Sequence, residues 1–500
     1  MFDKEKTMFN TITPEKAGIS SRVVLETLKA LDHYGFATHS IIMARGNDIF
    51  TECYYKPFGK DFLHRMYSVS KSFLGIAIGF AIDDGLLSLD DKLTDFFPEY
   101  KNENFNELLC ESTIRDMLMM STSMQVPISW FERHGGDRTS VYFTKKGEKI
   151  PGTLFRYDSP GSYMLGHILE NVTGKDFMSY MREKFLDAIG FSKEAYCLTV
   201  PEGNAFVDSG IMCTTRDLLA VARFALSLGE WNGKQYLSRQ YMEEATSKIV
   251  CNDTEGSALA GYGGYGYGYQ IWKAPNNGFA FVGMGDQFAV CDFEHDFIFV
   301  ITSDNQGSSN QTRPVLYHEL YNRIIPNLGE SLPDDAAAKA ELDNYIASRE
   351  LVHFGKTKFG AFASEIENVT YELEENPMGI ERIRFNFDGD KGVLSYKNAQ
   401  GEKELTFGIG YNEFSLFPEE GYSDLVAGIP CEGNKYRCAV SADWAEEKKL
   451  RLKVQVIDKY FGNACFIFSF KDERVSVLMT KHAEAFFEEY NGYAIGTAVR

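Results

Sequence analysis

The chain has 500 residues, of which 44% are hydrophobic and 24% charged, so it can bury a large core and form two or three domains. Its 71 acidic and 51 basic residues give a formal net charge of −20, which disfavours binding to nucleic acid and to anionic membrane surfaces. We therefore expect no nucleic-acid partner and no membrane partner.

The N-terminal residues and the cysteines are typical of a cytoplasmic protein. Residues 1–10 lack the basic segment and apolar run of a secretory signal. The longest apolar run, residues 73–82, is too short to span a bilayer. The nine cysteines are scattered and odd in number, without a CxxC pair, which indicates reduced thiols. A chain whose leader had been removed would look the same, and assembly into a homo-oligomer stays open.

The first part of the chain mixes helical and strand patterns, which predicts an α/β (α+β) domain with a sheet and a helical lobe. Residues 125–152 are polar and irregular, which indicates a surface loop or lid. The expected helices are 13–33, 69–83, 162–170, 175–187 and 215–229. The expected strands are 39–45, 48–55, 279–282, 286–291 and 297–303.

The pattern changes after a segment rich in turn formers, residues 326–335. Short alternating runs such as 382–387 and 450–457 then predict an all-β barrel or sandwich. We expect a first domain at 1–330, a linker helix within 331–350, and an antiparallel β domain at 351–500. A short helix at 482–490 is expected to close the chain.

Residues 66–73 place a hydroxyl and an amine at the start of a strongly apolar helix. Ser68 and Lys71 are three residues apart, so on a helix they share a face and can meet. An unpaired buried charge costs several kcal/mol, so a buried lysine needs a purpose. We take Ser68 as a candidate nucleophile and Lys71 as its helper.

A serine hydroxyl is a poor nucleophile until a base takes its proton, and a lysine amine does so only when it is neutral. Burial and the positive end of the helix dipole both favour the neutral amine. The alternative is a surface helix start with serine caps and a solvated Lys71. The apolar continuation of the helix argues against that alternative.

These residues, together with 82–92, 113–118, 210–218 and 266–270, resemble the serine β-lactamase and penicillin-binding-protein superfamily, in its class C β-lactamase-like branch of esterases, amide hydrolases and D-aminopeptidases. The resemblance covers residues 13–325, and Ser-x-x-Lys is the superfamily's signature. It implies an antiparallel sheet flanked by helices, with Ser68 as the acylated nucleophile assisted by Lys71.

The second motif of this superfamily is Tyr-x-Asn, and residues 157–159 stand in its place. By the resemblance, Tyr157 is the general base, because a phenolate held by an ammonium can take the Ser68 proton. Ser159 replaces the usual asparagine and keeps a hydroxyl for hydrogen bonding. The alternative for Tyr157 is a packed tyrosine in a loop.

The chain departs from the superfamily at the third motif, a Lys-Thr-Gly or His-x-Gly strand. Residues 281–283 take that place without a basic side chain, so recognition of a substrate carboxylate is in doubt. The resemblance implies that the N–H groups of Ser68 and Met284 form an oxyanion hole. It also implies that Phe281, Gly283 and Gly285 line the substrate site.

Residues 261–272 are rich in Gly and Tyr and contain a formal GxGxxG at Gly261, Gly263 and Gly266. A dinucleotide site needs a helix after this motif, whereas the continuation here is typical of a strand, so we expect no such cofactor. The aromatic residues Tyr262, Tyr265, Tyr267 and Trp272 either wall a substrate pocket or belong to the core. No metal-site motif is present, and we expect no cofactor.

The sequence thus predicts a serine hydrolase acting on an ester or amide of a small molecule or peptide through a Ser68 acyl-enzyme, with β-lactamase activity itself disfavoured. One alternative is a non-catalytic binding or regulatory protein of the same superfamily. Another is an acyltransferase. Intact Ser68, Lys71 and Tyr157 argue against the non-catalytic alternative.

Overall fold

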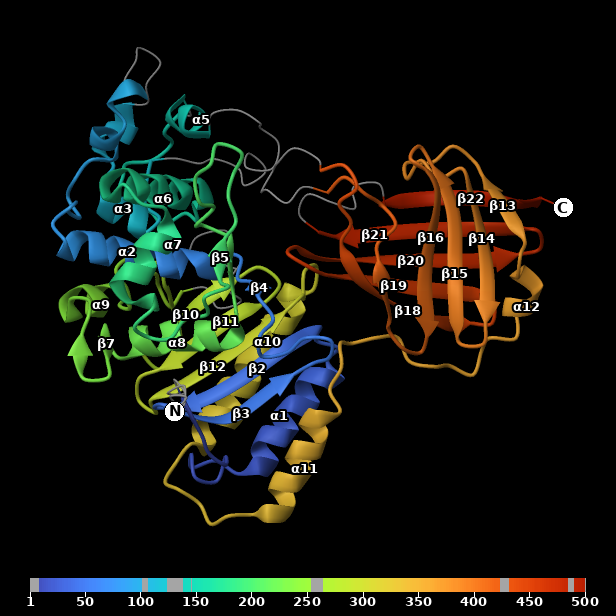
Figure 1. Cartoon of the computed structure of the whole chain (residues 1–500), viewed down its shortest axis with the longest axis horizontal. Helices are drawn as coiled ribbons and strands as arrows, with labels where there is room; N and C mark the ends of the chain where they lie inside the picture. Colours follow the sequence, from blue (N-terminus) through green and yellow to red (C-terminus); the bar gives the residue numbers. More distant parts are fainter. Residues whose placement is uncertain are drawn as a thin grey trace, which may run out of the picture. The chain divides into compact units, whose positions relative to one another are not determined.

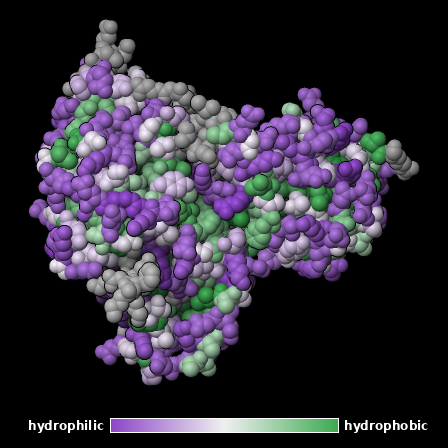
Figure 2. Space-filling view, in the orientation of Figure 1, coloured by the Kyte–Doolittle hydropathy of each residue, from purple (hydrophilic) through white to green (hydrophobic). Residues whose placement is uncertain are grey.

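A computed structural model describes residues 9–100, 107–123, 138–144, 146–252, 264–422, 431–483 and 490–499. The chain forms two compact units that divide after Glu350, coloured blue to yellow and orange to red in Figure 1. Hydrophilic residues cover much of the face in Figure 2, as the charge of −20 leads one to expect. Within these ranges no helix has the length and apolar character needed to cross a membrane.

The first unit is built on a seven-stranded sheet in the order β1-β3-β2-β12-β11-β10-β9. All neighbouring strands are antiparallel except β1 and β3. The expected strands of this region are confirmed, with ends shifted by at most one residue. The strands are β1 (Asn10–Thr11), β2 (Thr38–Arg45), β3 (Asp48–Tyr54), β9 (Trp272–Lys273), β10 (Phe279–Gly283), β11 (Gln287–Asp292) and β12 (Phe297–Ser303).

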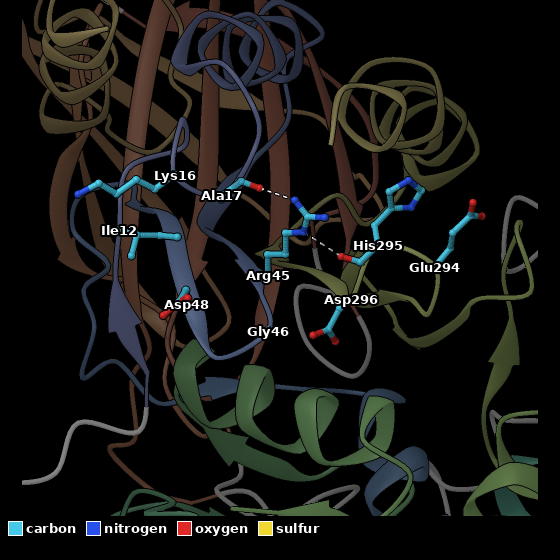
Figure 3. Close-up of a pocket in the computed structure, with 9 residues that line it drawn as sticks. All are labelled: Ile12, Lys16, Ala17, Arg45, Gly46, Asp48, Glu294, His295 and Asp296. Carbon is cyan, nitrogen blue, oxygen red and sulfur yellow. Dashed lines mark hydrogen bonds between the residues drawn. The ribbon is translucent and has the colours of Figure 1, made fainter. Parts of the chain in front are cut away.

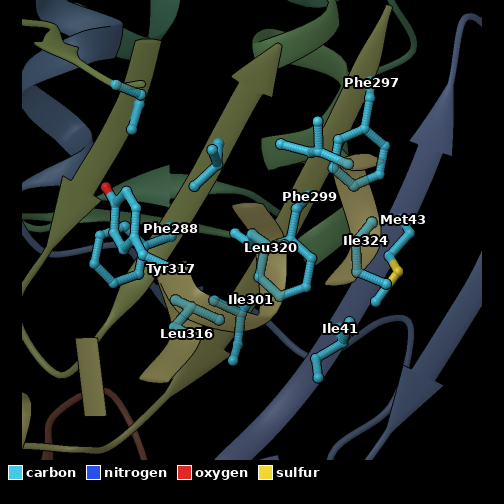
Figure 4. Packing of buried hydrophobic residues seen from close by; sticks show 14 of the residues in the cluster. Ile41, Met43, Phe288, Phe297, Phe299, Ile301, Leu316, Tyr317, Leu320 and Ile324 are labelled. Atoms are coloured by element: carbon cyan, nitrogen blue, oxygen red, sulfur yellow. The ribbon is translucent and has the colours of Figure 1, made fainter. Parts of the chain in front are cut away.

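One face of this sheet packs against α1 (Ser21–His33), α10 (Ser309–Glu319) and the π-helical η6 (Leu320–Ile324). Figure 4 shows Leu316 and Leu320 facing Phe299 and Ile301 of β12, all fully buried. Each such side chain contributes about 1.5–3 kcal/mol through burial. The helix expected to link two domains, α11 (Ala336–Ala347), lies against α1 within the first unit.

The other face of the sheet carries α2 (Val69–Asp83) and α8 (Thr215–Leu226), beyond which lies a helical lobe. Part of the expected loop at 125–152 is helical, namely α5, and residues 125–137 and 145 of it lie outside the described residues. The lobe contains η1 (Leu93–Phe96), η2 (Pro98–Tyr100), η3 (Glu107–Glu111), α3 (Ile114–Leu118), α5 (Arg138–Thr144), α6 (Ser159–Thr173), α7 (Phe177–Met181), η4 (Arg182–Leu186) and α9 (Arg239–Ala245).

Short strands and turns connect these parts of the first unit. A three-stranded sheet in the order β4-β6-β5 lies next to the start of α2. The remaining elements are β4 (His64–Arg65), β5 (Tyr196–Cys197), β6 (Ile211–Cys213), β7 (Glu230–Trp231), β8 (Lys234–Gln235) and η7 (Ile325–Asn327).

Helix α2 is buried along its length, as its apolar sequence predicts. Its glycines allow neighbouring backbone and side chains to approach closely. A Cβ on Gly75 would lie 2.5 Å from the carbonyl oxygen of Tyr269, and one on Gly79 would lie 2.4 Å from the ring of Tyr241. The predicted helix at 69–83 is confirmed at these bounds. It packs between the sheet and the helical lobe.

The second unit is a closed nine-stranded barrel, which decides between the barrel and the sandwich expected from the sequence. Neighbouring strands are antiparallel except β16 and β18, whose parallel pairing closes the ring, and β17 pairs along β18. Most of the helix expected at 482–490 lies outside the described residues. The elements are α12 (Ala363–Ile366), β13 (Thr370–Leu373), β14 (Arg382–Asp388), β15 (Lys391–Asn398), β16 (Gly401–Ile409), β17 (Glu413–Leu416), β18 (Arg437–Glu446), β19 (Lys449–Ile457), β20 (Phe461–Lys471), β21 (Arg474–His482) and β22 (Gly492–Val499).

Candidate active site

Ser68 stands at the N-cap of α2, but its hydroxyl makes no capping hydrogen bond. The preceding residue, Tyr67, has a φ of 48°, in the left-handed region that is strained for a residue with a side chain. Ser68 is partly exposed, whereas Val69 and Ser70 after it are buried. The sharp turn therefore leaves the Ser68 hydroxyl partly exposed at the N-terminal end of a buried helix.

Lys71 lies one turn along α2 and its side chain is only 2% exposed. Its Nζ donates a hydrogen bond to Ser68 Oγ at 3.1 Å and another to the backbone oxygen of Asp208 at 2.7 Å. The carboxylate of Asp208, also 2% exposed, lies 3.7 Å from the same Nζ. The structure thus brings together the predicted Ser68 and Lys71 and adds a buried counter-charge.

Tyr157 lies beside the same amine, with Lys71 Nζ 5.1 Å from the centre of its ring. The ring stacks on Trp272, with the two centroids 5.7 Å apart and the planes at 21°. Asp158, the next residue, caps α6 and accepts hydrogen bonds from Gly161 N and from the Thr122 hydroxyl. These contacts hold Tyr157 at the site although it belongs to a loop.

Strand β10 ends next to the nucleophile. A Cβ on Gly283 would lie 2.5 Å from the backbone oxygen of Met66, so glycine is needed at this close approach. Met284 follows at the start of a tight turn in which Gly285 and Asp286 have φ values of 72° and 66°. The Gln287 side chain donates to the Met284 oxygen at 2.9 Å. Gly283 and Met284 are therefore held close to the residues that precede Ser68.

A buried ion pair anchors the same turn from behind. Asp286 is fully buried, and its Oδ1 accepts a hydrogen bond from Arg313 Nε at 2.7 Å. Thr312 donates to the other carboxylate oxygen. The Ser303 hydroxyl donates to the backbone oxygen of Gly285 at 2.6 Å. This network fixes the backbone at the end of β10, where a catalytic donor is expected.

Comparisons with known proteins show the family to which the chain belongs. The model of the Beta-lactamase family matches residues 25–321, more than half of the chain. The chain belongs to the Beta-lactamase family. It resembles a 6-aminohexanoate-dimer hydrolase from Paenarthrobacter ureafaciens, with 26% identity over 225 residues, 41% of this chain and 56% of the relative.

Two further relatives carry names from this family. A beta-lactamase from Pseudomonas fluorescens is 26% identical over 149 residues, 29% of this chain and 40% of the relative. The chain thus spans about half the length of the curated relatives that it matches. A crystal structure of a putative beta-lactamase from Bacteroides dorei has a TM-score of 0.50 at 15% identity, covering 59% of this chain and 96% of that one, and this shows the fold alone.

Within the Beta-lactamase fold, three predicted site residues besides Lys71 have buried side chains. Tyr267 is 1% exposed and packs against Phe155 and Trp272, so it supports the wall behind Tyr157 and does not present its ring to a ligand. Phe281 is fully buried on β10. Ser159 is 6% exposed at the first turn of α6. Gly261 and Gly263 of the formal GxGxxG lie outside the described residues.

Sequence reasoning missed two residues that build the site, Asp208 and Gln270, and left Trp272 open between a pocket wall and the core. Gln270 joins three helices, because its side chain donates to the Met117 oxygen and accepts from Ser162, while its backbone oxygen accepts from Ser72. Asp208 had a usable signal, since it is the one charged residue between 203 and 215. A lone acid in such a segment points to a buried partner.

Two histidines, one in β2 and one in β4, form a buried pair in the first unit. His39 Nδ1 lies 2.8 Å from His64 Nε2, and His64 Nδ1 lies 2.8 Å from the oxygen of Arg65. Burial lowers the pKa of His64 to about 3 and the pKa of His39 well below its ordinary value. Both rings are therefore neutral in the folded protein at neutral pH.

We expect this pair to make the protein less stable in mild acid. The unfolded chain takes up protons as the pH falls below about 6.5, whereas the folded pair does not, so the free energy of unfolding falls with pH. The loss is about 2 kcal/mol per histidine between about pH 7 and about pH 5 and levels off near the His64 pKa of about 3. Urea unfolding across this range measures the slope.

A His64→Gln variant should show a shallower slope, and His33→Gln, at an exposed position, should leave the slope unchanged. Equal slopes in all three proteins would contradict the assignment of acid sensitivity to the buried pair.

A hollow of about 370 Å³ lies elsewhere in the first unit, at the turns after β2 and β11 (Figure 3). Arg45 donates to the backbone oxygens of Ala17 and His295 there, at 2.7 and 3.1 Å. None of the candidate catalytic residues lines this hollow. Its polar contacts tie chain segments together and do not converge on a ligand.

Proposed function

We propose that the protein is a serine hydrolase that cleaves an ester or amide of a small molecule or peptide through an acyl-enzyme on Ser68. One observation carries the proposal: the 3.1 Å hydrogen bond from Lys71 Nζ to the Ser68 hydroxyl at the partly exposed start of a buried helix. Membership of the Beta-lactamase family and the hydrolase names of its relatives support it. We assign the activity to residues 1–330.

In the proposed reaction Tyr157, as a phenolate beside the Lys71 amine, takes the Ser68 proton as Oγ attacks the substrate carbonyl carbon. The tetrahedral intermediate collapses, Tyr157 passes the proton to the leaving alcohol or amine, and an ester to Ser68 remains. Water then attacks this ester with Tyr157 again as base, Tyr157 passes that proton to Ser68 Oγ as the ester bond breaks, and the acid product leaves. Ser68 is regenerated, so all atoms and protons balance.

The backbone N–H groups of Ser68 and Met284 are proposed to stabilise the oxyanion. The close approach of Gly283 to Met66 supports this role, because it places the end of β10 next to the nucleophile. Loss of one oxyanion donor typically costs about 3–4 kcal/mol of transition-state stabilisation. The anchored turn at Asp286 keeps this backbone in place without movement during the reaction.

The substrate proposed here lacks a carboxylate next to the scissile bond. Residues 281–283 of β10 carry no lysine or histidine, which the superfamily pattern places on this strand. Neutral esters and amides are therefore better substrates than penicillins in this proposal. The β domain at 351–500 is proposed to play no chemical part, since Ser68, Lys71 and Tyr157 all lie in the first unit.

Covalent labelling tests this function. The protein is incubated with a fluorophosphonate, an activated ester and a penicillin, and intact mass is followed by peptide mapping. We expect adducts with the first two probes, located on Ser68, and none after unfolding in urea. A protein that reacts with none of the probes, or reacts at another residue, would disprove the proposal.

A further inference from the structure

Lys71 and Asp208 form an ion pair in which both side chains are only 2% exposed. Lys71 Nζ contacts Asp208 twice, at the backbone oxygen at 2.7 Å and at Oδ2 at 3.7 Å. A buried ion pair is expensive to form, because both charges lose their hydration. Its position next to the Ser68 hydroxyl gives it a use in the reaction.

The segment that carries Asp208 is hydrogen-bonded to residues before and after Ser68. Before Ser68, Met66 N donates to the Ile211 oxygen at 2.8 Å, and the buried Arg65 side chain donates to the Ser209 oxygen at 3.1 Å. After Ser68, the hydroxyl of Ser70 accepts from Ile211 N at 3.1 Å. Asp208 is therefore held in register with Ser68 and Lys71.

A close contact joins the same segment to the helix that follows Tyr157. A Cβ on Gly166 of α6 would lie 2.2 Å from Val207 Cγ2, so α6 and residue 207 touch. Asp208 thus lies in a segment that contacts both the nucleophile helix α2 and the helix α6.

We propose that Asp208 is a positioning residue whose carboxylate keeps Lys71 charged and directed at Ser68, so that Lys71 acts as a fixed cation and not as the base. This rests on the proposed function of Ser68. An ammonium has three donors, and the Ser68 hydroxyl and the Asp208 backbone oxygen take two of them. The carboxylate of Asp208, 3.7 Å from Nζ, stabilises the charged form of the amine at this buried position.

Among the residues that the structure describes, four other titratable groups face this pair. Tyr157 lies beside the Lys71 amine. The charge of Asp208 acts on Tyr163 of α6 and on Cys197 of β5. The charge of Arg65 of β4 acts on Cys197 in the opposite direction. Burial, their main influence, raises the pKa of the Tyr163 phenol and of the Cys197 thiol. These two groups therefore stay neutral over the pH range in which the site works.

The pH profile of kcat/KM of an Asp208→Asn variant tests the proposal. A Lys71 that must be charged and a Lys71 that must be neutral predict opposite changes in activity for this variant. Asparagine keeps the backbone contact and the size but removes the negative charge. If Lys71 must be charged, the alkaline limb of kcat/KM moves to lower pH by about one unit or more, and activity on that limb falls about tenfold or more. If Lys71 must be neutral, activity rises on the acid limb instead, which would overturn the proposal.

Asp217→Asn is the matched control, because Asp217 is a buried aspartate that caps α8 and has no contact with Lys71 among the described interactions. It should lower stability without moving either limb. Asp208→Glu should restore part of the alkaline limb. An unmoved profile in Asp208→Asn would also overturn the proposal.

Labelling of Ser68 by a fluorophosphonate separates this inference from the proposed function. If the unmodified protein is not labelled at Ser68, the proposed function fails. If the unmodified protein and Asp208→Asn are both labelled at Ser68, but the alkaline limb is the same in both, only the role of Asp208 fails.

Discussion

A Ser68→Ala variant is expected to lose ester and amide turnover by a factor on the order of 10⁴ or more, because the acyl-enzyme has no oxygen on which to form. In the structure the Ser68 hydroxyl caps no helix and is partly exposed. Its removal should therefore leave the fold unchanged. Steady-state kcat/KM on the activated ester identified by labelling measures the loss, and thermal unfolding checks the fold.

Ser72→Ala is the matched control for this variant. Ser72 lies on the same helix, and its hydroxyl donates to the backbone oxygen of Gln270 at 2.8 Å, away from Lys71. It should keep its turnover within about tenfold, with a loss of about 1 kcal/mol of stability from the missing hydrogen bond. Turnover retained by Ser68→Ala and lost by Ser72→Ala would reject Ser68 as the nucleophile.

Tyr157→Phe is expected to lower kcat by about 10²–10⁴, the usual contribution of a general base, while KM changes little. Phenylalanine keeps the ring that stacks on Trp272 at 5.7 Å and removes only the hydroxyl that carries the proton. The burst of acylation should slow in the same proportion as kcat. Pre-steady-state release of the leaving group measures this burst.

The half-exposed Tyr236, which follows β8 and lies outside the site, gives the control Tyr236→Phe with unchanged kinetics. A Tyr157→Phe protein with normal kcat and a normal burst would assign the proton transfer to Lys71. That result would also contradict the role that we propose for Asp208, since this role requires a charged Lys71 and a charged lysine cannot act as the base.

Local patterns predicted the longer strands and several helices of the first unit, but not α9 and α10. The apolar run after Ser68 predicted α2 at its observed bounds, and hairpin chemistry at 45–48 predicted the turn between β2 and β3. Such patterns work because helix and strand periodicity depend on neighbours in sequence. The barrel closure was not predicted, because pairing of β16 with β18 joins strands that the sequence separates.

The candidate site was predicted unevenly for the same reason. Ser68 and Lys71 share one helix, so their spacing alone predicted the contact at 3.1 Å. Tyr157 entered only through the resemblance to a known superfamily, because its loop carries no local signal for a base. The direction of the Tyr267 ring could not be predicted, since packing against Trp272 and Phe155 decides whether it faces the core or a ligand.

The sequence by itself determined that a hydroxyl and an amine can meet at the start of an apolar helix, because residues three apart on a helix share a face. Only the tertiary structure decided what surrounds that pair. It placed Asp208 as a buried counter-charge, brought Gly283 against Met66 and stacked Tyr157 on Trp272. These contacts join segments far apart in the chain, and close packing of the whole unit decides which of them form.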